Sequence, residues 1–299
     1  MSANQSIAQI RSQVDLPPRR SLWQDVVRRF LRHRIGTIGF AITLLVIFVA
    51  IFGPVLAPAP PNQMLFTEAF GSPSLAHPFG TDDFGRDILS RIMYGAQVSL
   101  LVGVISVSIA STGGTVLGMI AGYGGRILDE AIMRVMDVLF AFPTILLALA
   151  VMAILGKGVN NAMIAIGVVY LPIFARIARS STLKVKNEEY VQVAQALGAK
   201  DAHIMLHHIF PNILAPIIVE TSLSLSFAIL AEAALSFFGL GMQPPDPSWG
   251  RMLSEGREFF NQSVWLGIFP GLAIMFTVMG FNFLGDGLRD SLDPSMAKH

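Results

Sequence analysis

Six long apolar stretches, separated by polar segments, dominate the chain. A helix needs about 20 residues to cross a hydrocarbon core of about 30 Å, and each stretch approaches or exceeds that length. We place them at residues 36–57, 97–122, 137–155, 161–178, 212–239 and 264–285. Backbone polar groups in lipid must be satisfied internally, so stretches of this length favour helices. The pattern predicts an all-α membrane protein built as a six-helix transmembrane bundle.

The polar segments around these stretches complete the predicted organisation. Residues 1–35 form a cytoplasmic arm before the first transmembrane helix, and residues 58–96 form an extracytoplasmic loop after it. Residues 97–285 form a five-helix core with a cytoplasmic loop at 179–211, and residues 286–299 form a cytoplasmic tail. The core and its loop are therefore the first places to look for function.

A short amphipathic helix is predicted at the end of the arm, where Ser21 can cap it. Its apolar residues fall four apart in two rows, and its arginines fill the other side: Leu22, Val26, Phe30; Trp23, Val27, Leu31; Arg28, Arg29, Arg32. This pattern suits a helix lying on the anionic inner surface of the membrane. A helix packed on the protein's own cytosolic face has the same periodicity, so both interpretations stay open.

Composition narrows the chemistry of the chain. Its 299 residues are 53% hydrophobic and 14% charged, which is too apolar for an ordinary soluble domain. There is no cysteine, which excludes disulfides, zinc-thiolate sites and a catalytic thiol. No G-x-x-x-x-G-K-[ST] loop occurs, so the chain does not bind ATP by that route.

Lysine and arginine are unevenly distributed between the two sides of the predicted bundle. The arm lacks the early apolar run of a cleavable signal peptide, which favours a cytoplasmic N-terminus. With that orientation sixteen of the 21 Lys and Arg residues lie inside, and the remainder lie outside: Arg86, Arg91, Lys157, Arg251 and Arg257. This positive-inside bias predicts a multi-pass protein of the inner (plasma) membrane with both termini in the cytoplasm.

Three regularly spaced glycines in the second predicted span indicate a contact between helices. Gly114, Gly118 and Gly122 recur every four residues in the second predicted span. They leave one helix face without side chains, on which another backbone can approach closely. We expect this face to be buried against a second helix.

The cytoplasmic loop at 179–211 is polar, yet its residues predict an ordered structure. Asn187 can cap a helix, and Gly198 offers the left-handed turn that ends one. Asp201 lies near the start of a second short helix, and Pro211 restarts the chain toward the membrane. Two short helices at a sharp angle would form a protrusion suited to docking another protein.

This loop resembles the EAA loop of ATP-binding-cassette importer permeases. That loop has Glu-Ala-Ala three residues before a glycine and Leu-Pro twelve residues after it, and here Ala194, Gly198 and Pro211 match the pattern. Gln192, Val193 and Phe210 stand in place of the family's Glu, Ala and Leu. In the family the loop forms a coupling helix that sits in a groove of the ATPase subunit. The resemblance therefore assigns ATPase docking to Gln192, Ala194, Gly198, Ala199, Asp201 and Pro211.

Two outer segments, 77–91 and 238–250, resemble the dipeptide, oligopeptide and nickel subgroup of these permeases. The residues that carry this signature are Gly80, Thr81, Asp82, Gly85, Arg86, Asp87, Pro244, Pro245 and Trp249. The likeness covers nearly the whole chain after residue 35 and indicates the C-type permease of a heterodimeric pair. Because the opposite charges at 82–87 can pair locally, a structural outer cap is favoured over a contact with a cationic substrate, which stays open.

The resemblance also implies partners and substrates. A complete importer would contain an extracytoplasmic substrate-binding protein, this permease, a homologous second permease and two ATPases. The chain itself would be non-catalytic and bind no cofactor, with ATP and Mg held by the ATPases. Membrane lipid surrounds it, and no nucleic-acid partner is expected. Dipeptides or short oligopeptides are the expected substrates, with glutathione, opine-like compounds or a nickel complex as alternatives.

Glu220 and Glu232 are the only acidic residues well inside a predicted span. A carboxylate in lipid costs several kcal/mol, so both are expected to face inward. Glu232 suits either a polar path or gate between two permeases or a structural hydrogen bond to a neighbouring helix. Glu220, nearer the cytoplasm, could line the same path or anchor the span. Twelve residues rotate the two by about 120°, so they do not share a site on a regular helix.

His203 and His207 lie one helical turn apart beside His208, which raises the question of a metal site. No Glu completes a His-Glu-x-x-His arrangement, so we expect no metal site there.

Two rival functions are less well supported. An intramembrane enzyme needs His beside Ser, paired carboxylates or metal ligands at membrane depth, and all six histidines lie outside the predicted spans. A membrane scaffold would not need a coupling loop.

Overall fold

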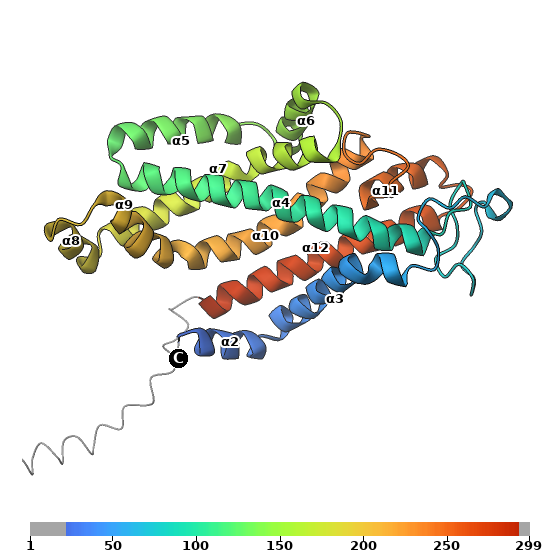
Figure 1. Ribbon diagram of the computed structural model, residues 1–299, viewed down its shortest axis with the longest axis horizontal. Coiled ribbons are helices and arrows are strands. Elements are labelled where there is room, and N and C mark those ends of the chain that lie inside the picture. Colours follow the sequence, from blue (N-terminus) through green and yellow to red (C-terminus); the bar gives the residue numbers. More distant parts are fainter. Residues whose placement is uncertain (1–21, 293–299) are drawn as a thin grey trace, which may run out of the picture.

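The computed structural model describes residues 22–292, and Figure 1 shows an elongated bundle of roughly aligned helices. The helices in chain order are α2 (Leu22–Arg32), α3 (Arg34–Leu56), α4 (Ile88–Tyr123), α5 (Arg126–Phe140), α6 (Thr144–Leu155), α7 (Val159–Lys186), α8 (Glu189–Ala196), α9 (Asp201–Ile204), α10 (Phe210–Phe237), α11 (Trp249–Glu258) and α12 (Trp265–Leu292). A 3₁₀ turn, η1 (Phe66–Glu68), and a π turn, η2 (Met205–Ile209), complete the described elements. The predicted all-α fold is confirmed.

Among residues 22–292, five helices are long and apolar enough to cross a membrane, and the number is six if one bent helix pair is counted as a single span. The five are α3, α4, α7, α12 and the continuous run Asp201–Phe237 that contains α10. The span predicted at 137–155 is not one straight helix and begins earlier, because residues 126–155 form α5 and α6 with a bend of 96° between them. Pro143 lies at the bend, where its missing N–H and its restriction on the preceding residue interrupt the helix.

Two predicted boundaries also differ from the structure. Asp87 caps α4 by accepting a hydrogen bond from the Ser90 N–H at 2.7 Å, so 88–96 is helix and not outer loop. Ser90 and Arg91 in the first turn of α4 lower the local hydropathy, which hid this start from a hydropathy pattern. At the other end of the chain, α12 continues to Leu292, so the first half of the predicted tail 286–299 is helical.

The amphipathic helix predicted in the arm is present as α2, while Ser21 lies outside the described residues. The chain bends between α2 and α3 at His33, whose Nδ1 accepts a hydrogen bond from the Gly36 N–H at 2.9 Å. Phe30 packs against the close contact between α3 and α12, whereas Val27 and Leu31 are exposed. One edge of α2 therefore packs on the protein, as one of the two interpretations expects. A second apolar edge faces outward, and its contact with the membrane surface stays a prediction.

The face of α4 that carries the three glycines is packed against a second helix, α7, as predicted. A Cβ on Gly114 would lie 2.6 Å from the Leu171 carbonyl oxygen of α7, and one on Gly122 would lie 2.8 Å from the Thr182 Cβ. Gly118 meets the α7 backbone with still less room. This close approach makes α4 and α7 a tightly packed pair along this stretch of both helices.

The two ends of the bundle carry different elements (Figure 1). The start of α2, the end of α12 and the α8–α9 segment lie at one end. The long loop between α3 and α4 and the helix α11 lie at the other. The elements predicted as cytoplasmic and as extracytoplasmic are thus separated by the length of the bundle.

Candidate functional site

The α8–α9 segment forms a protrusion at one end of the bundle, shaped by a turn at Gly198. This residue has a φ of +83°, and a Cβ added there would meet nothing within 4 Å. Its conformation is therefore a backbone requirement, which glycine meets without strain, rather than a matter of space. The Ala199 N–H donates to the Ala194 carbonyl oxygen at 3.1 Å, which closes the turn after α8. The predicted left-handed turn is confirmed.

Two details of the protrusion differ from the sequence-based prediction. Asn187 does not cap α8 but ends α7, where its Nδ2 donates to the Leu183 carbonyl at 2.9 Å. Pro211 does not restart the chain, because α9 runs through the π turn into α10 as one continuous helix. In the π turn before Pro211, the Phe210 N–H donates to the Met205 carbonyl, five residues earlier. The next residue, Pro211, has no N–H to donate, so this wider turn suits it.

The protrusion exposes apolar side chains at its tip. Leu197 is 82% exposed and Val193 is 52% exposed, while Val191 and Ile204 are buried beneath them. Large apolar groups exposed on a projection are typical of a surface that contacts another protein. Of the residues assigned to docking, Gln192, Gly198, Asp201 and Pro211 are exposed, and Ala194 and Ala199 are half-buried.

A cluster around Tyr123, at the end of α4, anchors the protrusion to the bundle. The Tyr123 hydroxyl donates to Asp201 Oδ1 at 2.8 Å and accepts from Gln195 Nε2 at 3.1 Å. Lys186 Nζ donates to the Tyr123 carbonyl at 2.9 Å and lies 4.9 Å from the centre of the Tyr123 ring. α7, α8 and α9 are thereby joined at one side chain of α4. Sequence reasoning missed Tyr123, because nothing in a single helix end signals contacts with residues more than sixty positions away.

The outer end is held by a buried ionic cluster. Arg86 Nε lies 2.6 Å from Asp82 Oδ2, and Arg91, which is 1% exposed at its side chain, lies 3.4 Å from Glu255 of α11. Asp82 Oδ2 also lies 3.5 Å from Arg91 Nε. Burial, with the neighbouring Asp82 carboxylate, raises the pKa of Asp83. These opposite charges satisfy one another, which supports the structural cap that was favoured from the sequence. Arg91 and Glu255 were not predicted as members.

His77 links two acidic groups in the same outer loop. Its Nδ1 lies 2.8 Å from Asp87 Oδ2, and its Nε2 lies 2.8 Å from Glu68 Oε2. The hydrogen bond with Asp87, helped by the one with Glu68, raises the pKa of His77 above its usual value of 6.5. Asp87 therefore has two tasks, since its other oxygen caps α4.

Tight turns position this cluster. Gly80 and Gly85 both have positive φ, +79° and +72°. A Cβ on Gly85 would collide with the Leu65 carbonyl, so the chain needs glycine there for space as well as for conformation. The Thr81 hydroxyl donates to the Glu68 carbonyl, which ties the turn to η1.

The second outer segment packs on the first through α11. Trp249 is buried, and its indole N–H donates to the Ile92 carbonyl of α4 at 3.0 Å. Ser248 caps α11 by accepting from the Arg251 N–H at 3.3 Å. The Pro244–Pro245 peptide bond that precedes this helix is cis. The outer signature residues from both segments thus form one folded cap.

Glu232 is enclosed by its own chain and does not face a partner. Its side chain is 1% exposed, and its two oxygens accept from Ser99 Oγ of α4 at 2.9 Å and Ser236 Oγ of α10 at 2.7 Å. The hypothesis that it faces a path between two permeases does not fit this burial. The alternative from the sequence, a hydrogen bond to a neighbouring helix, does.

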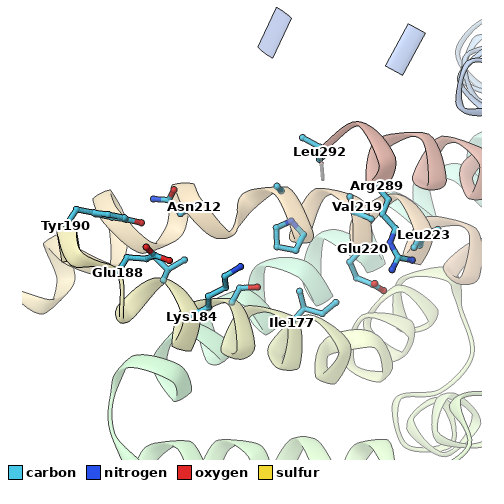
Figure 2. Close-up of a pocket in the computed structure, with 14 residues that line it drawn as sticks. Ile177, Lys184, Glu188, Tyr190, Asn212, Val219, Glu220, Leu223, Arg289 and Leu292 are labelled. Carbon is cyan, nitrogen blue, oxygen red and sulfur yellow. The ribbon is translucent and has the colours of Figure 1, made fainter. Parts of the chain in front are cut away.

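Glu220 instead lines an open cavity of about 620 Å³ bounded by α7, α8, α10 and α12 (Figure 2). Its carboxylate accepts from Ser224 Oγ at 3.0 Å and lies half-buried. Figure 2 shows Glu220 and Arg289 projecting from neighbouring helices into the same space, with Lys184 on the opposite wall. Glu220 and Glu232 therefore face different surroundings, as their spacing on α10 predicts.

The histidines of the protrusion form no metal cluster. The rings of His203 and His207 are stacked with centroids 4.3 Å apart, and His208 meets His203 edge-on at 5.7 Å. Within residues 22–292 no group of three or more His, Asp or Glu side chains is placed to hold a metal ion.

Comparison with known families fits this architecture. Residues 114–298 match the family described as the binding-protein-dependent transport system inner membrane component. Residues 21–78 match the N-terminal transmembrane domain of oligopeptide transport permease C. The two matches together include the arm helix, the first span and most of the five-helix core.

Curated relatives match over almost the full chain. The dipeptide transport system permease protein DppC of Alkalihalophilus pseudofirmus is 48% identical over 276 residues, which are 92% of this chain and 91% of the relative. The glutathione transport system permease protein GsiD is 44% identical in Pectobacterium atrosepticum, over 93% of this chain and 92% of that one. The GsiD protein of Escherichia coli O6:K15:H31 is 45% identical with the same coverage.

Among solved structures, an inward-facing form of the MetNI methionine ABC transporter resembles the fold. The match has a TM-score of 0.55 at 15% identity and covers 67% of this chain and 94% of the other. At 15% identity, this match is evidence for the fold alone. Together with the family matches, it means that the chain belongs to the binding-protein-dependent transport system inner membrane components and is a non-catalytic permease subunit of an ATP-binding-cassette importer.

Proposed function

We propose that the chain is the C-type half of a heterodimeric permease that imports dipeptides or short oligopeptides. Dipeptide and putative peptide transport permeases are among its relatives, at 48% and 42% identity over nine-tenths of the chain. The observation that carries the proposal is the α8–α9 protrusion, with an exposed apolar tip and a base tied to the membrane helices. Such a projection suits a coupling helix that another subunit grips.

The proposed mechanism passes movement through the base of the protrusion. Two ATPase subunits close on ATP and displace the tip at Leu197, which is exposed for that contact. The bonds of Tyr123 to Asp201 and Gln195 carry the displacement to α4. Because α4 packs tightly on α7, the pair moves as one body and exchanges inward for outward access.

The remaining partners follow from this assembly. A homologous second permease completes the path, and an extracytoplasmic binding protein delivers the substrate to the outer cap. The protrusion lies in the cytoplasm, as do both termini, which agrees with the sixteen of 21 Lys and Arg residues in the segments assigned to that side from the sequence. ATP and Mg are bound by the ATPases and not by this chain.

The test is reconstitution of the complex that co-purifies with the tagged chain. Leu197→Asp places a charge at the exposed tip, and Gly198→Val places a β-branched residue at a φ of +83°. Both variants should lose peptide uptake, and lose either bound ATPase or the stimulation of its activity by loaded binding protein. The matched controls are Ile127→Asp, which alters a residue of α5 that is 85% exposed, and Gly267→Ala, where an added Cβ meets nothing within 4 Å. Normal uptake by both tip variants would refute the docking assignment.

Glutathione is the second candidate substrate, because two relatives named as glutathione permeases are 44% and 45% identical to this chain. Glutathione has the ammonium group and the carboxylate of a short peptide and one additional carboxylate, so both substrates offer the permease charged groups of both signs. Competition between labelled dipeptide and glutathione for uptake by the reconstituted complex decides between the two.

A further inference from the structure

One face of α10 runs continuously along two cavities of the bundle. The residues on this face recur every three or four positions: Pro216, Glu220, Leu223, Phe227, Leu230 and Ala234. That spacing is one stripe of a helix. The first three line the cavity of about 620 Å³ near the cytoplasmic end, and the last three line a second cavity of about 640 Å³ nearer the outer end. A solute moving along this stripe meets both.

The two cavities differ in charge. Apolar side chains dominate the second cavity, whose lining residues include no acidic or basic one. The first is lined by Glu220 of α10, Lys184 of α7, Arg289 of α12 and Glu188 at the start of α8. A solute that moves along this face of α10 therefore contacts charged side chains, of both signs, only in the cytoplasmic half.

The charges of the first cavity are not matched to one another. Within residues 22–292, none of Glu220, Lys184 and Arg289 has an opposite charge within 4.0 Å, and Glu220 accepts only the Ser224 hydroxyl. The neighbouring cavity between α5 and α7 is different, because there Arg176 pairs with Asp137 at 2.7 Å and Arg179 pairs with Asp129. A carboxylate at membrane depth needs water or a partner. The open cavity is thus equipped to receive a ligand that brings its own charges.

We propose that this cavity binds the two end groups of a zwitterionic peptide, as the release site of the import path. Glu220 accepts hydrogen bonds from the ligand's ammonium group, and the cationic side chains of Arg289 and Lys184 bind its carboxylate. A guanidinium suits this task because it presents a planar pair of donors to a carboxylate. A cavity of about 620 Å³ lies within the usual range for small-ligand sites. The inference rests on the proposed import of peptides and adds the residues that contact them.

The first experiment measures uptake by the reconstituted complex with alanyl-alanine. Glu220→Gln and Arg289→Gln each remove one charge and keep a polar side chain, so each should lower the rate on the order of tenfold, the loss of one charge-assisted hydrogen bond. The matched controls are Glu130→Gln and Arg126→Gln, which break an exposed pair on α5 that lies outside this cavity.

The second experiment leaves the charges intact and reads occupancy directly. Ser181→Cys lines the proposed site, and Ser180→Cys, its neighbour in the chain, lines the cavity between α5 and α7. In complexes open to the cytosol, millimolar alanyl-alanine should slow maleimide labelling at position 181 and not at 180. N-acetyl-alanyl-alanine amide, which has no end charges, should not. This measurement does not depend on how well the Gln variants assemble or on selection by the binding protein.

The outcomes distinguish the proposed binding site from the proposed import of peptides. Uptake of alanyl-alanine by the native complex, with normal uptake by both Gln variants and no protection of the Ser181→Cys variant from labelling, would overturn the site and leave peptide import standing. Protection by the neutral peptide as well would overturn the role of the end charges. Labelling at position 181 that is blocked without any peptide would mean that a partner subunit fills the cavity, which also overturns the site. No uptake of any peptide by the native complex would overturn import and site together.

Discussion

The Tyr123 hydroxyl at the end of α4 lies 2.8 Å from Asp201 Oδ1 at the start of α9, although 78 positions separate them in the chain. It is one of two side-chain bonds that tie the protrusion to Tyr123, the other coming from Gln195 at 3.1 Å. Because α4 spans the bundle, this contact links the protrusion to a further membrane helix, in addition to the continuous run from α9 into α10.

Tyr123→Phe should therefore loosen coupling while leaving the fold intact. The change removes the hydroxyl and both of its hydrogen bonds, each worth about 0.5–1.5 kcal/mol at a partly exposed site. We expect more ATP hydrolysed per peptide imported, measured in proteoliposomes from the same samples. Tyr94→Phe is the control, since that hydroxyl makes a single long bond, 3.4 Å, to the Pro54 carbonyl. An unchanged ratio of ATP to peptide would remove Tyr123 from the coupling route.

Glu232 is expected to stabilise the folded protein and not to act as a gate. Glu232→Gln keeps an acceptor for at least one of the hydroxyls of Ser99 and Ser236, so uptake should remain near normal. Glu232→Leu leaves both hydroxyls without their acceptor, at about 1–3 kcal/mol for each buried group. We expect a lower yield of assembled complex and a lower melting temperature for Leu only. Loss of uptake in a well-assembled Gln variant would instead support a gate.

The outer cap should become less stable as pH rises. The pKa of His77 is raised above 6.5 in the folded protein by Asp87 and Glu68. Its contribution is fully present below the unfolded pKa and is lost as pH rises through the higher folded pKa, that is, from about neutral pH upward. Limited proteolysis of the outer loop across this range measures the effect. His77→Gln should flatten the pH dependence, and an equal slope in that variant would contradict the assignment.

The orientation of the chain can be read with single cysteines, since the sequence contains none. Leu75 in the outer loop and Leu197 at the protrusion are both highly exposed, unlike the buried Ser248. A membrane-impermeant maleimide should label Leu75→Cys from outside intact cells and Leu197→Cys only after the cells are opened. The reverse result would invert the proposed topology.

Local physics explains what the sequence could determine. The apolar stretches predicted the helices because crossing a membrane imposes a length and a composition on each segment separately. The glycine row of α4 predicted a close contact, and Gly198 predicted a left-handed turn, since both follow from the missing Cβ of single residues. The bend between α5 and α6 was missed because hydropathy does not register the break at Pro143.

The partners of polar side chains needed the tertiary structure. Glu220 and Glu232 lie on one helix, and their spacing indicated different directions, but not which one is sealed by Ser99 and which one faces a cavity with Arg289. The Arg91–Glu255 pair in the outer cap joins elements 164 positions apart. Sequence sets the direction of a side chain relative to its own helix. What it meets there depends on how helices pack, and that is decided by the whole bundle at once.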